Sequence, residues 1–134
     1  MARILLVDDY PDALDVWSLY LTMCGFEVVT AGDGLAALDV AQRERPNLAI
    51  LDLELPGISG FELARRLRAD RTWAAVPLIA VTGHSQPAHI EEARRAGFDL
   101  VRTKPCAPDQ LCADIRRLLA ESKDSSVPSD ALKR

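Results

Sequence analysis

Five short runs of apolar and β-branched residues recur along the chain and predict the strands of a sheet. The runs in residues 4–7, 48–51 and 77–81 are apolar throughout, which is typical of parallel strands that helices cover on both faces. The runs in residues 27–30 and 100–103 include polar side chains, as strands at the edges of a sheet do. Successive runs begin about 20 to 30 residues apart, which is the size of one β–α–β unit.

Longer amphipathic stretches lie between these runs and predict helices. Apolar side chains recur every three or four positions in residues 14–21, 61–67 and 111–119. Pro11 suits the first turn of a helix, whereas Gly25, Gly97 and the Arg45-Pro46 pair are typical of helix ends. The alternation predicts an α/β fold: a doubly wound, flavodoxin-like parallel sheet of five strands in the order 2-1-3-4-5, with five helices.

The length and composition indicate one domain. The chain has 134 residues, of which 49% are apolar, and this suffices for a single domain that buries its own core. We expect the domain to span residues 1–120, because residues 121–134 are polar and lack a core-facing period. These last residues predict a flexible tail that is too short to form a second domain, so a stand-alone domain is expected.

Charge and cysteine content exclude several classes of protein. The 16 basic and 20 acidic residues give a net charge of −4, which argues against nucleic-acid and membrane-surface binders, since both need a basic face. Three cysteines without a paired short spacing indicate neither a disulfide framework nor a zinc site. The apolar runs are too short for a membrane span, and no signal-peptide core precedes Asp8. A cytoplasmic location is therefore expected.

Side chains that can bind ligands or react follow four of the five predicted strands. Asp8 and Asp9 follow the first, Asp52 the third, Thr82 the fourth and Lys104 the fifth. Ligands bind at the carboxyl ends of strands in such sheets, so we expect these side chains to share one crevice. Crowded carboxylates repel one another unless a cation lies between them, and all-oxygen ligands favour Mg²⁺ before Ca²⁺. Beside a metal, a hydroxyl and an ammonium hold phosphoryl oxygens, and a carboxylate is the available nucleophile.

Four motifs at these strand ends resemble the response-regulator receiver domain of two-component signalling. In the family's order and spacing over residues 3–120, they are Val7-Asp8-Asp9, residues 51–60, Val81-Thr82-Gly83 and Thr103-Lys104-Pro105. The resemblance implies a phosphorylation-dependent signalling switch or relay and not an enzyme, with only weak autophosphorylation and autodephosphorylation. It implies that Asp52 accepts a phosphoryl group from a sensor histidine kinase or a histidine phosphotransfer protein.

The resemblance also implies a metal site and a metal. Asp9 would bind Mg²⁺ directly and Asp8 mainly through water. Asp52 and the backbone carbonyl of Glu54 would complete the protein ligands.

The same resemblance implies roles for residues on the neighbouring loops. Lys104 would pair with Asp52 and then with the phosphoryl group, while Thr82 would swing inward to hydrogen-bond a phosphoryl oxygen. Pro105 would follow a cis peptide bond, which is plausible because only an X-Pro bond keeps the cis penalty low. Gly60 is expected to be a structural turn residue before the third helix.

Two further polar residues flank the site. Glu54 and His84 lie two positions after Asp52 and Thr82, where the family tunes the lifetime of the phosphoaspartate. They are therefore candidate modulators of dephosphorylation. Two exposed loop side chains without a role are an equally good interpretation.

This chain departs from the family at two positions. The family often has an aromatic residue three positions before the lysine, where this chain has Val101, and a phenylalanine after the Lys-Pro pair, where it has Cys106. The aromatic half of the usual switch is missing. Output is still expected as contact with a downstream protein through the fourth helix, fifth strand and fifth helix.

Two other functions are compatible with parts of the same pattern. A haloacid-dehalogenase-type phosphatase also uses aspartate, Mg²⁺, threonine and lysine, but its nucleophile follows the first strand and its acidic metal ligands come last. Here the Asp8-Asp9 pair comes first, and Glu54 stands where that enzyme has its second aspartate. A receiver that acts as a constitutive binding module stays open because of Val101.

Overall fold

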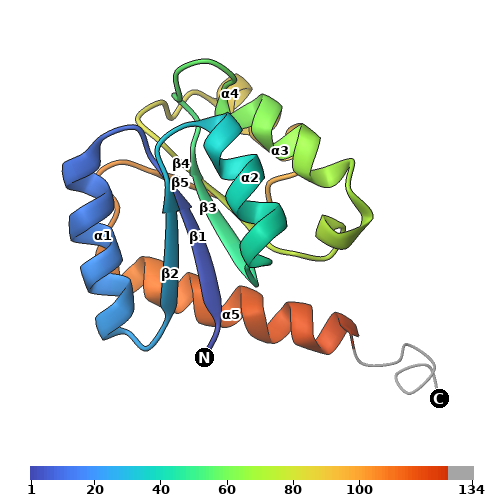
Figure 1. The fold of residues 1–134 in the computed structure, drawn as a ribbon. Helices are drawn as coiled ribbons and strands as arrows, with labels where there is room; N and C mark the ends of the chain where they lie inside the picture. Colours follow the sequence, from blue (N-terminus) through green and yellow to red (C-terminus); the bar gives the residue numbers. More distant parts are fainter. Residues whose placement is uncertain (127–134) are drawn as a thin grey trace.

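The computed structural model describes residues 1–126 and contains one parallel sheet. Its five strands lie in the order β2-β1-β3-β4-β5 (Figure 1). The predicted order and the two predicted edge strands are confirmed. The strands are β1 (Arg3–Val7), β2 (Glu27–Ala31), β3 (Leu48–Asp52), β4 (Leu78–Thr82) and β5 (Leu100–Thr103).

Helices cover both faces of this sheet. They are α1 (Pro11–Met23), α2 (Gly34–Glu44), α3 (Gly60–Arg68), α4 (Pro87–Ala96) and α5 (Pro108–Ser126), with a short 3₁₀ helix η1 (Arg71–Trp73) after α3. The apolar sides of α1 and α5 pack on one face, and those of α2, α3 and α4 pack on the other (Figure 1). Within residues 1–126, none of the helices is long and apolar enough to cross a membrane.

Alternation along the strands divides the core into two layers. Leu5 and Leu51 face α2, α3 and α4, whereas Ile4 and Ile50 face α1 and α5. All four are almost completely buried. Successive side chains of a strand point to opposite faces, and burial of each such side chain contributes about 1.5 to 3 kcal/mol. The apolar runs of the sequence therefore become strands that are buried on both faces.

The helix ends have recognisable local causes. The side chain of Asp33 accepts a hydrogen bond from the backbone N–H of Ala36 at the start of α2, and Ser59 does the same for Glu62 at the start of α3. Helix α4 ends at Gly97, whose φ of 115° lies in the left-handed region. The helix end that the sequence predicts at Gly97 is confirmed.

Helix α5 extends into the segment that the sequence predicts to be a flexible tail. It continues to Ser126, although residues 121–134 were expected to be a flexible tail. Leu111, Ile115 and Leu118 fix the helix on the sheet, and adding further turns to a formed helix is cheap. The hydroxyl of Ser122 also donates a hydrogen bond to the carbonyl of Ala75 (3.0 Å). The rest of the predicted tail, residues 127–134, lies outside the described residues.

Trp73 lies in the 3₁₀ helix η1, in the connection after α3. Its place in a connection between two elements predicts partial exposure, yet its side chain is buried in the layer with α2 and α3. The 3₁₀ turn η1 directs the side chain inward, which the sequence pattern does not indicate.

The strand register aligns the carboxyl ends of the central strands. Val7 of β1 pairs with Leu51 of β3, so Asp8 and Asp52 follow paired residues. On the other side, Thr82 of β4 pairs with Thr103 of β5, immediately before Lys104. The register therefore brings side chains from four separate segments to one edge of the sheet.

Candidate functional site

Three carboxylates meet at the carboxyl edge of the sheet. One oxygen each from Asp8, Asp9 and Asp52 lies within 4.8 Å of the others. Asp52 is buried, Asp8 is half-buried and Asp9 is exposed, so the cluster opens from the end of β3 towards solvent. A set of oxygen ligands with open positions for water fits Mg²⁺, which keeps several waters when it binds to proteins. The residues therefore suit the predicted cation, and a cation would relieve the repulsion among them.

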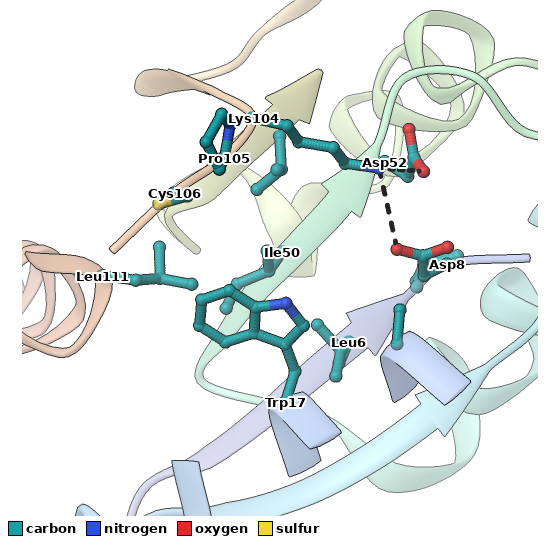
Figure 2. Close-up of a pocket in the computed structure, with 12 residues that line it drawn as sticks. Leu6, Asp8, Trp17, Ile50, Asp52, Lys104, Pro105, Cys106 and Leu111 are labelled. Atoms are coloured by element: carbon teal, nitrogen blue, oxygen red, sulfur yellow. Dashed lines mark hydrogen bonds and ion pairs between the residues drawn. The ribbon is translucent and has the colours of Figure 1, made fainter. Parts of the chain in front are cut away.

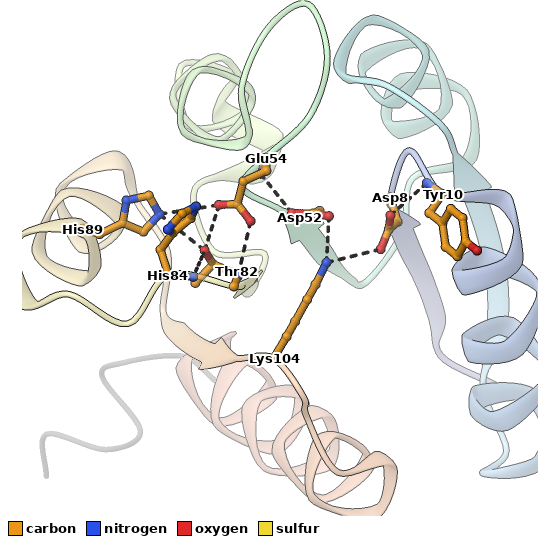
Figure 3. A network of polar contacts seen from close by, with 9 residues as sticks. Asp8, Tyr10, Asp52, Glu54, Thr82, His84, His89 and Lys104 are labelled. Carbon is orange, nitrogen blue, oxygen red and sulfur yellow. Dashed lines mark hydrogen bonds and ion pairs between the residues drawn. The ribbon is translucent and has the colours of Figure 1, made fainter.

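Lys104 places a positive charge beside these acids. Its Nζ lies 3.0 Å from Oδ2 of Asp52 and 3.9 Å from Oδ2 of Asp8 (Figure 3). The backbone N–H of Lys104 also donates to the carbonyl of Thr82 (2.7 Å), which ties the end of β5 to β4. The peptide bond between Lys104 and Pro105 is cis, as predicted.

Asp52 is held from two sides. The backbone N–H of Glu54 donates to its Oδ1 (2.9 Å), while Lys104 pairs with its Oδ2. Burial raises the pKa of Asp52 above its usual value, although both hydrogen bonds and the charge of Lys104 act in the opposite direction. Burial alone would lower the pKa of Lys104, but its hydrogen bond to Asp52 and the charge of that carboxylate raise it overall.

Gly60 packs directly against the end of β3. A Cβ atom at this position would lie 2.4 Å from the carbonyl oxygen of Asp52 and 2.7 Å from Cα of Leu53. Such distances leave no room for any side chain. The predicted structural role of Gly60 therefore has a specific cause: α3 begins in contact with the backbone that carries Asp52.

The side chain of Glu54 points towards Thr82 and not towards the acids (Figure 3). Thr82 donates a hydrogen bond from Oγ1 to Oε2 of Glu54 (2.8 Å), and the backbone N–H of Gly83 donates to Oε1 (3.3 Å). Burial alone would raise the pKa of Glu54, but these two hydrogen bonds and the nearby imidazoles lower it overall. The hydroxyl of Thr82 is thus bonded to Glu54 in this structure.

His89 joins this network and was not singled out from the sequence. Its Nε2 lies 3.4 Å from Oγ1 of Thr82 and 3.6 Å from Oε2 of Glu54. His84, which the sequence did single out, is exposed and contributes its backbone N–H to Thr82 (3.0 Å). The sequence offers no signal for His89, because its position beside Thr82 depends on how α4 packs.

A cavity of about 280 Å³ lies directly beneath the polar groups (Figure 2). Trp17 of α1 and Leu111 of α5 form its walls together with β1 and β3. Cys106 lines it where the family often has a phenylalanine, and Asp52 and Lys104 lie at its polar end.

Val101 occupies the other position where the chain departs from the family. It is partly buried and packs against the layer formed with α2, α3 and α4. A valine has no ring to rotate, so the aromatic half of the family's usual switch is missing at this position.

The structure thus brings most of the predicted residues together. Asp8, Asp9, Asp52 and Lys104 form one polar group at the carboxyl edge, and the backbone of Glu54 adjoins it. Thr82 lies next to this group but is turned towards Glu54. An acid cluster with a paired lysine at this edge can hold a divalent cation and phosphoryl oxygens.

Comparison with known proteins identifies the family. Residues 4–116 match the response regulator receiver domain, so the chain belongs to this family of two-component signalling proteins. It is 35% identical over 122 residues to the DNA-binding response regulator MtrA of Mycolicibacterium smegmatis, covering 91% of this chain and 52% of that protein. It is 36% identical over 119 residues to the DNA-binding dual master transcriptional regulator RpaA of Synechocystis, covering 89% and 49%. The chain spans about half the length of these relatives.

Solved structures agree with this assignment. A CheY-like receiver domain protein from Methanospirillum hungatei superposes with a TM-score of 0.88 at 31% identity, covering 94% of this chain and 99% of the other. The chemotaxis response regulator CheY4 of Vibrio cholerae gives a TM-score of 0.83 at 31% identity, covering 88% and 98%. The predicted family and fold are confirmed, and with them a role in phosphoryl signalling.

Proposed function

We propose that this receiver accepts a phosphoryl group on Asp52, in a reaction that depends on Mg²⁺, from a sensor histidine kinase or a histidine phosphotransfer protein. The observation that carries the proposal is the 3.0 Å pair between Lys104 and Asp52 inside the acid cluster. In this family such a chain is a signalling switch, and catalysis is limited to weak autophosphorylation and autodephosphorylation.

The chemistry follows from the groups at the site. An oxygen of Asp52 forms a bond to phosphorus as the phosphorus–nitrogen bond of the donor phosphohistidine breaks, and the imidazole leaves with the electron pair and takes a proton from solvent. Lys104 then holds a phosphoryl oxygen by charge, and Thr82 donates a hydrogen bond to another. When bound by Asp8, Asp9, Asp52 and the carbonyl of Glu54, Mg²⁺ supplies positive charge for the phosphoryl oxygens.

Output is proposed to be a protein contact that changes on phosphorylation. The face formed by α4, β5 and α5 is the proposed docking surface for a downstream target. Relay of the phosphoryl group to another histidine is the alternative output. Phosphorylation need shift the contact by only about 1 to 3 kcal/mol to act as a switch.

The expectations about nucleic-acid partners, further domains, cellular location and phosphoaspartate lifetime stay predictions. The relatives named above are DNA-binding regulators of about twice this length, so they do not support the expected absence of a nucleic-acid partner or of a further domain. The cytoplasmic location and the influence of Glu54 and His84 on the lifetime of the phosphoaspartate are likewise predictions.

Intact mass after incubation with acetyl phosphate tests the proposal. With Mg²⁺, the wild-type chain should gain the mass of one phosphoryl group. The Asp52→Asn variant should gain none, and neither should the wild type with the metal chelated. Steady release of free phosphate from many substrates would instead indicate a phosphatase, and no mass gain at any donor concentration would contradict acceptance from small donors.

A further inference from the structure

The first turn of α4 has few attachments to the rest of the molecule. The helix begins after Gln86, whose side chain makes no capping hydrogen bond, and Pro87 supplies no N–H. Among the described residues, His89 makes the polar side-chain contact that joins this turn to another element. The attachment of this turn therefore depends on one imidazole.

The imidazole of His89 is fixed in place by packing. The ring of Phe61 on α3 meets it edge to face, with 5.0 Å between centroids and an interplanar angle of 84°. Farther along, Arg65 of α3 and Glu92 of α4 lie 3.7 Å apart. These contacts hold Nε2 of His89 towards the oxygens of Thr82 and Glu54, between which an Nε2–H would be shared (Figure 3).

Thr82 takes part in both the resting network and the proposed phosphoryl site. Its hydroxyl has one proton, which it donates to Glu54 in this structure. A phosphoryl oxygen on Asp52 would compete for that proton and draw the hydroxyl away from Glu54 and His89. The two arrangements exclude each other, because one hydroxyl proton serves one strong acceptor at a time.

We propose that His89 is a positioning residue: with Glu54 it holds Thr82 away from Asp52, and when a phosphoryl group takes the threonine hydroxyl, the first turn of α4 is released. This proposal rests on phosphorylation of Asp52. It provides a route from the site to the face of α4, β5 and α5 without an aromatic side chain at position 101. Because coupling is reciprocal, loss of the His89 contact should make the phosphorylated arrangement easier to reach.

Amide hydrogen exchange of residues 87–92 tests the proposal in the full chain. Exchange is measured with Mg²⁺ alone and with Mg²⁺ plus beryllium trifluoride, a stable phosphoryl mimic. Intact mass after acetyl phosphate, measured on the same preparations, reports acceptance on Asp52 independently. In wild type the mimic should accelerate exchange about fivefold, the lower end of the coupling usually found between sites.

Three variants separate positioning from packing. His89→Leu keeps apolar bulk against Phe61 but removes the polar contact, so exchange should be fast without the mimic and the mimic should bind about fivefold more tightly. His89→Gln restores an N–H donor and should regain most of the wild-type behaviour. Gln86→Leu adds the same apolar side chain next to the same turn and should behave as wild type.

Two results would overturn the proposal. One is wild-type protein that gains phosphoryl mass while exchange in residues 87–92 stays unchanged. The other is His89→Leu with wild-type exchange and wild-type affinity for the mimic. Absence of the mass gain itself would instead contradict acceptance from small donors. If His89→Leu fails to fold, exchange in residues 87–92 of the wild type and of His89→Gln, with and without the mimic, still tests the proposal.

Discussion

Arg102 on β5 and Asp114 on α5 form a two-point ion pair, with 2.7 Å between Nε and Oδ2 and 2.8 Å between Nη2 and Oδ1. Asp114 is only 2% exposed, and Gln110 donates a third hydrogen bond to it (3.1 Å). Burial alone would raise the pKa of Asp114, but the hydrogen bonds from Arg102 and Gln110 and the charge of Arg102 lower it overall. The pair joins the edge strand to α5 in the proposed output face.

Asp114→Asn should therefore destabilise the protein and change its response to acid. It leaves Arg102 without its carboxylate, so the free energy of unfolding should fall by about 3 kcal/mol, the low end for a broken buried pair because Arg102 is partly exposed. In wild type, the ionised carboxylate of Asp114 adds to the free energy of unfolding. This addition is complete above the pKa of the group in the unfolded chain, about 3.9, and is lost as the pH falls through its lowered pKa in the folded protein.

Urea unfolding from pH 7 to pH 3 measures both effects. The difference between wild type and Asp114→Asn should shrink below about pH 4, because this carboxyl is protonated in the unfolded chain before it is protonated in the folded protein. Arg117→Ala, which removes a half-exposed charge from the same carboxylate, should cost less than about 0.5 kcal/mol. An equal effect of the two substitutions would argue against the two-point pair.

Arg68 joins three segments and is predicted to be a major source of stability. Its guanidinium donates to the carbonyls of Trp73 (2.5 Å), Val76 (2.7 Å) and Gly97 (2.8 and 3.0 Å), and to Asp99 (2.9 Å). Arg68→Ala should lower the free energy of unfolding by about 3 kcal/mol, because several charge-assisted hydrogen bonds disappear together and partly buried carbonyls lose their donor.

Arg68→Lys should recover less than half of that loss, since a single ammonium cannot reproduce the planar set of donors. Arg66→Ala, two positions earlier on the exposed side of α3, is the matched control and should cost no more than about 0.5 kcal/mol. Chemical denaturation of the three variants is the measurement, and full recovery by lysine would contradict the proposed geometry.

Gly60→Ala should impair both stability and phosphoryl acceptance. The added Cβ would overlap the backbone of Asp52 and Leu53, so the end of β3 must move. We expect a loss of about 2 kcal/mol, within the range for overpacking, together with slower mass gain from acetyl phosphate. Gly32→Ala is the matched control, since a Cβ there meets nothing within 4 Å. Unchanged acceptance in Gly60→Ala would show that the displacement does not reach the acid.

Asp9→Asn should stabilise the protein when no divalent cation is present. The substitution removes one of three clustered carboxylates, each repelling its neighbours by about 1 kcal/mol where water screens them. Mg²⁺ should raise the unfolding temperature of wild type clearly and that of Asp9→Asn much less, because a ligand at a given concentration stabilises the folded state more when it binds more tightly. Thermal unfolding with and without Mg²⁺ checks this, and an equal Mg²⁺ effect in both proteins would place the cation elsewhere.

The sequence by itself determined the strands, their order and most of the site. Apolar runs such as residues 48–51 have one satisfactory environment, the centre of a parallel sheet, and the polar residues that follow them must then lie at its carboxyl edge. Asp8, Asp52 and Lys104 could be predicted for this reason, since Asp8 and Lys104 directly follow strands and Asp52 is the last residue of one.

Only the tertiary structure decided which way side chains turn once they reach that edge. His89 meets Thr82 because α4 packs against α3, and Glu54 turns away from the acids because Thr82 and Gly83 offer it hydrogen bonds. Arg68 binds carbonyls up to 29 residues away along the chain. Periodicity reports whether a position faces the core, whereas these contacts join segments distant in sequence, and their geometry exists only after the helices have packed.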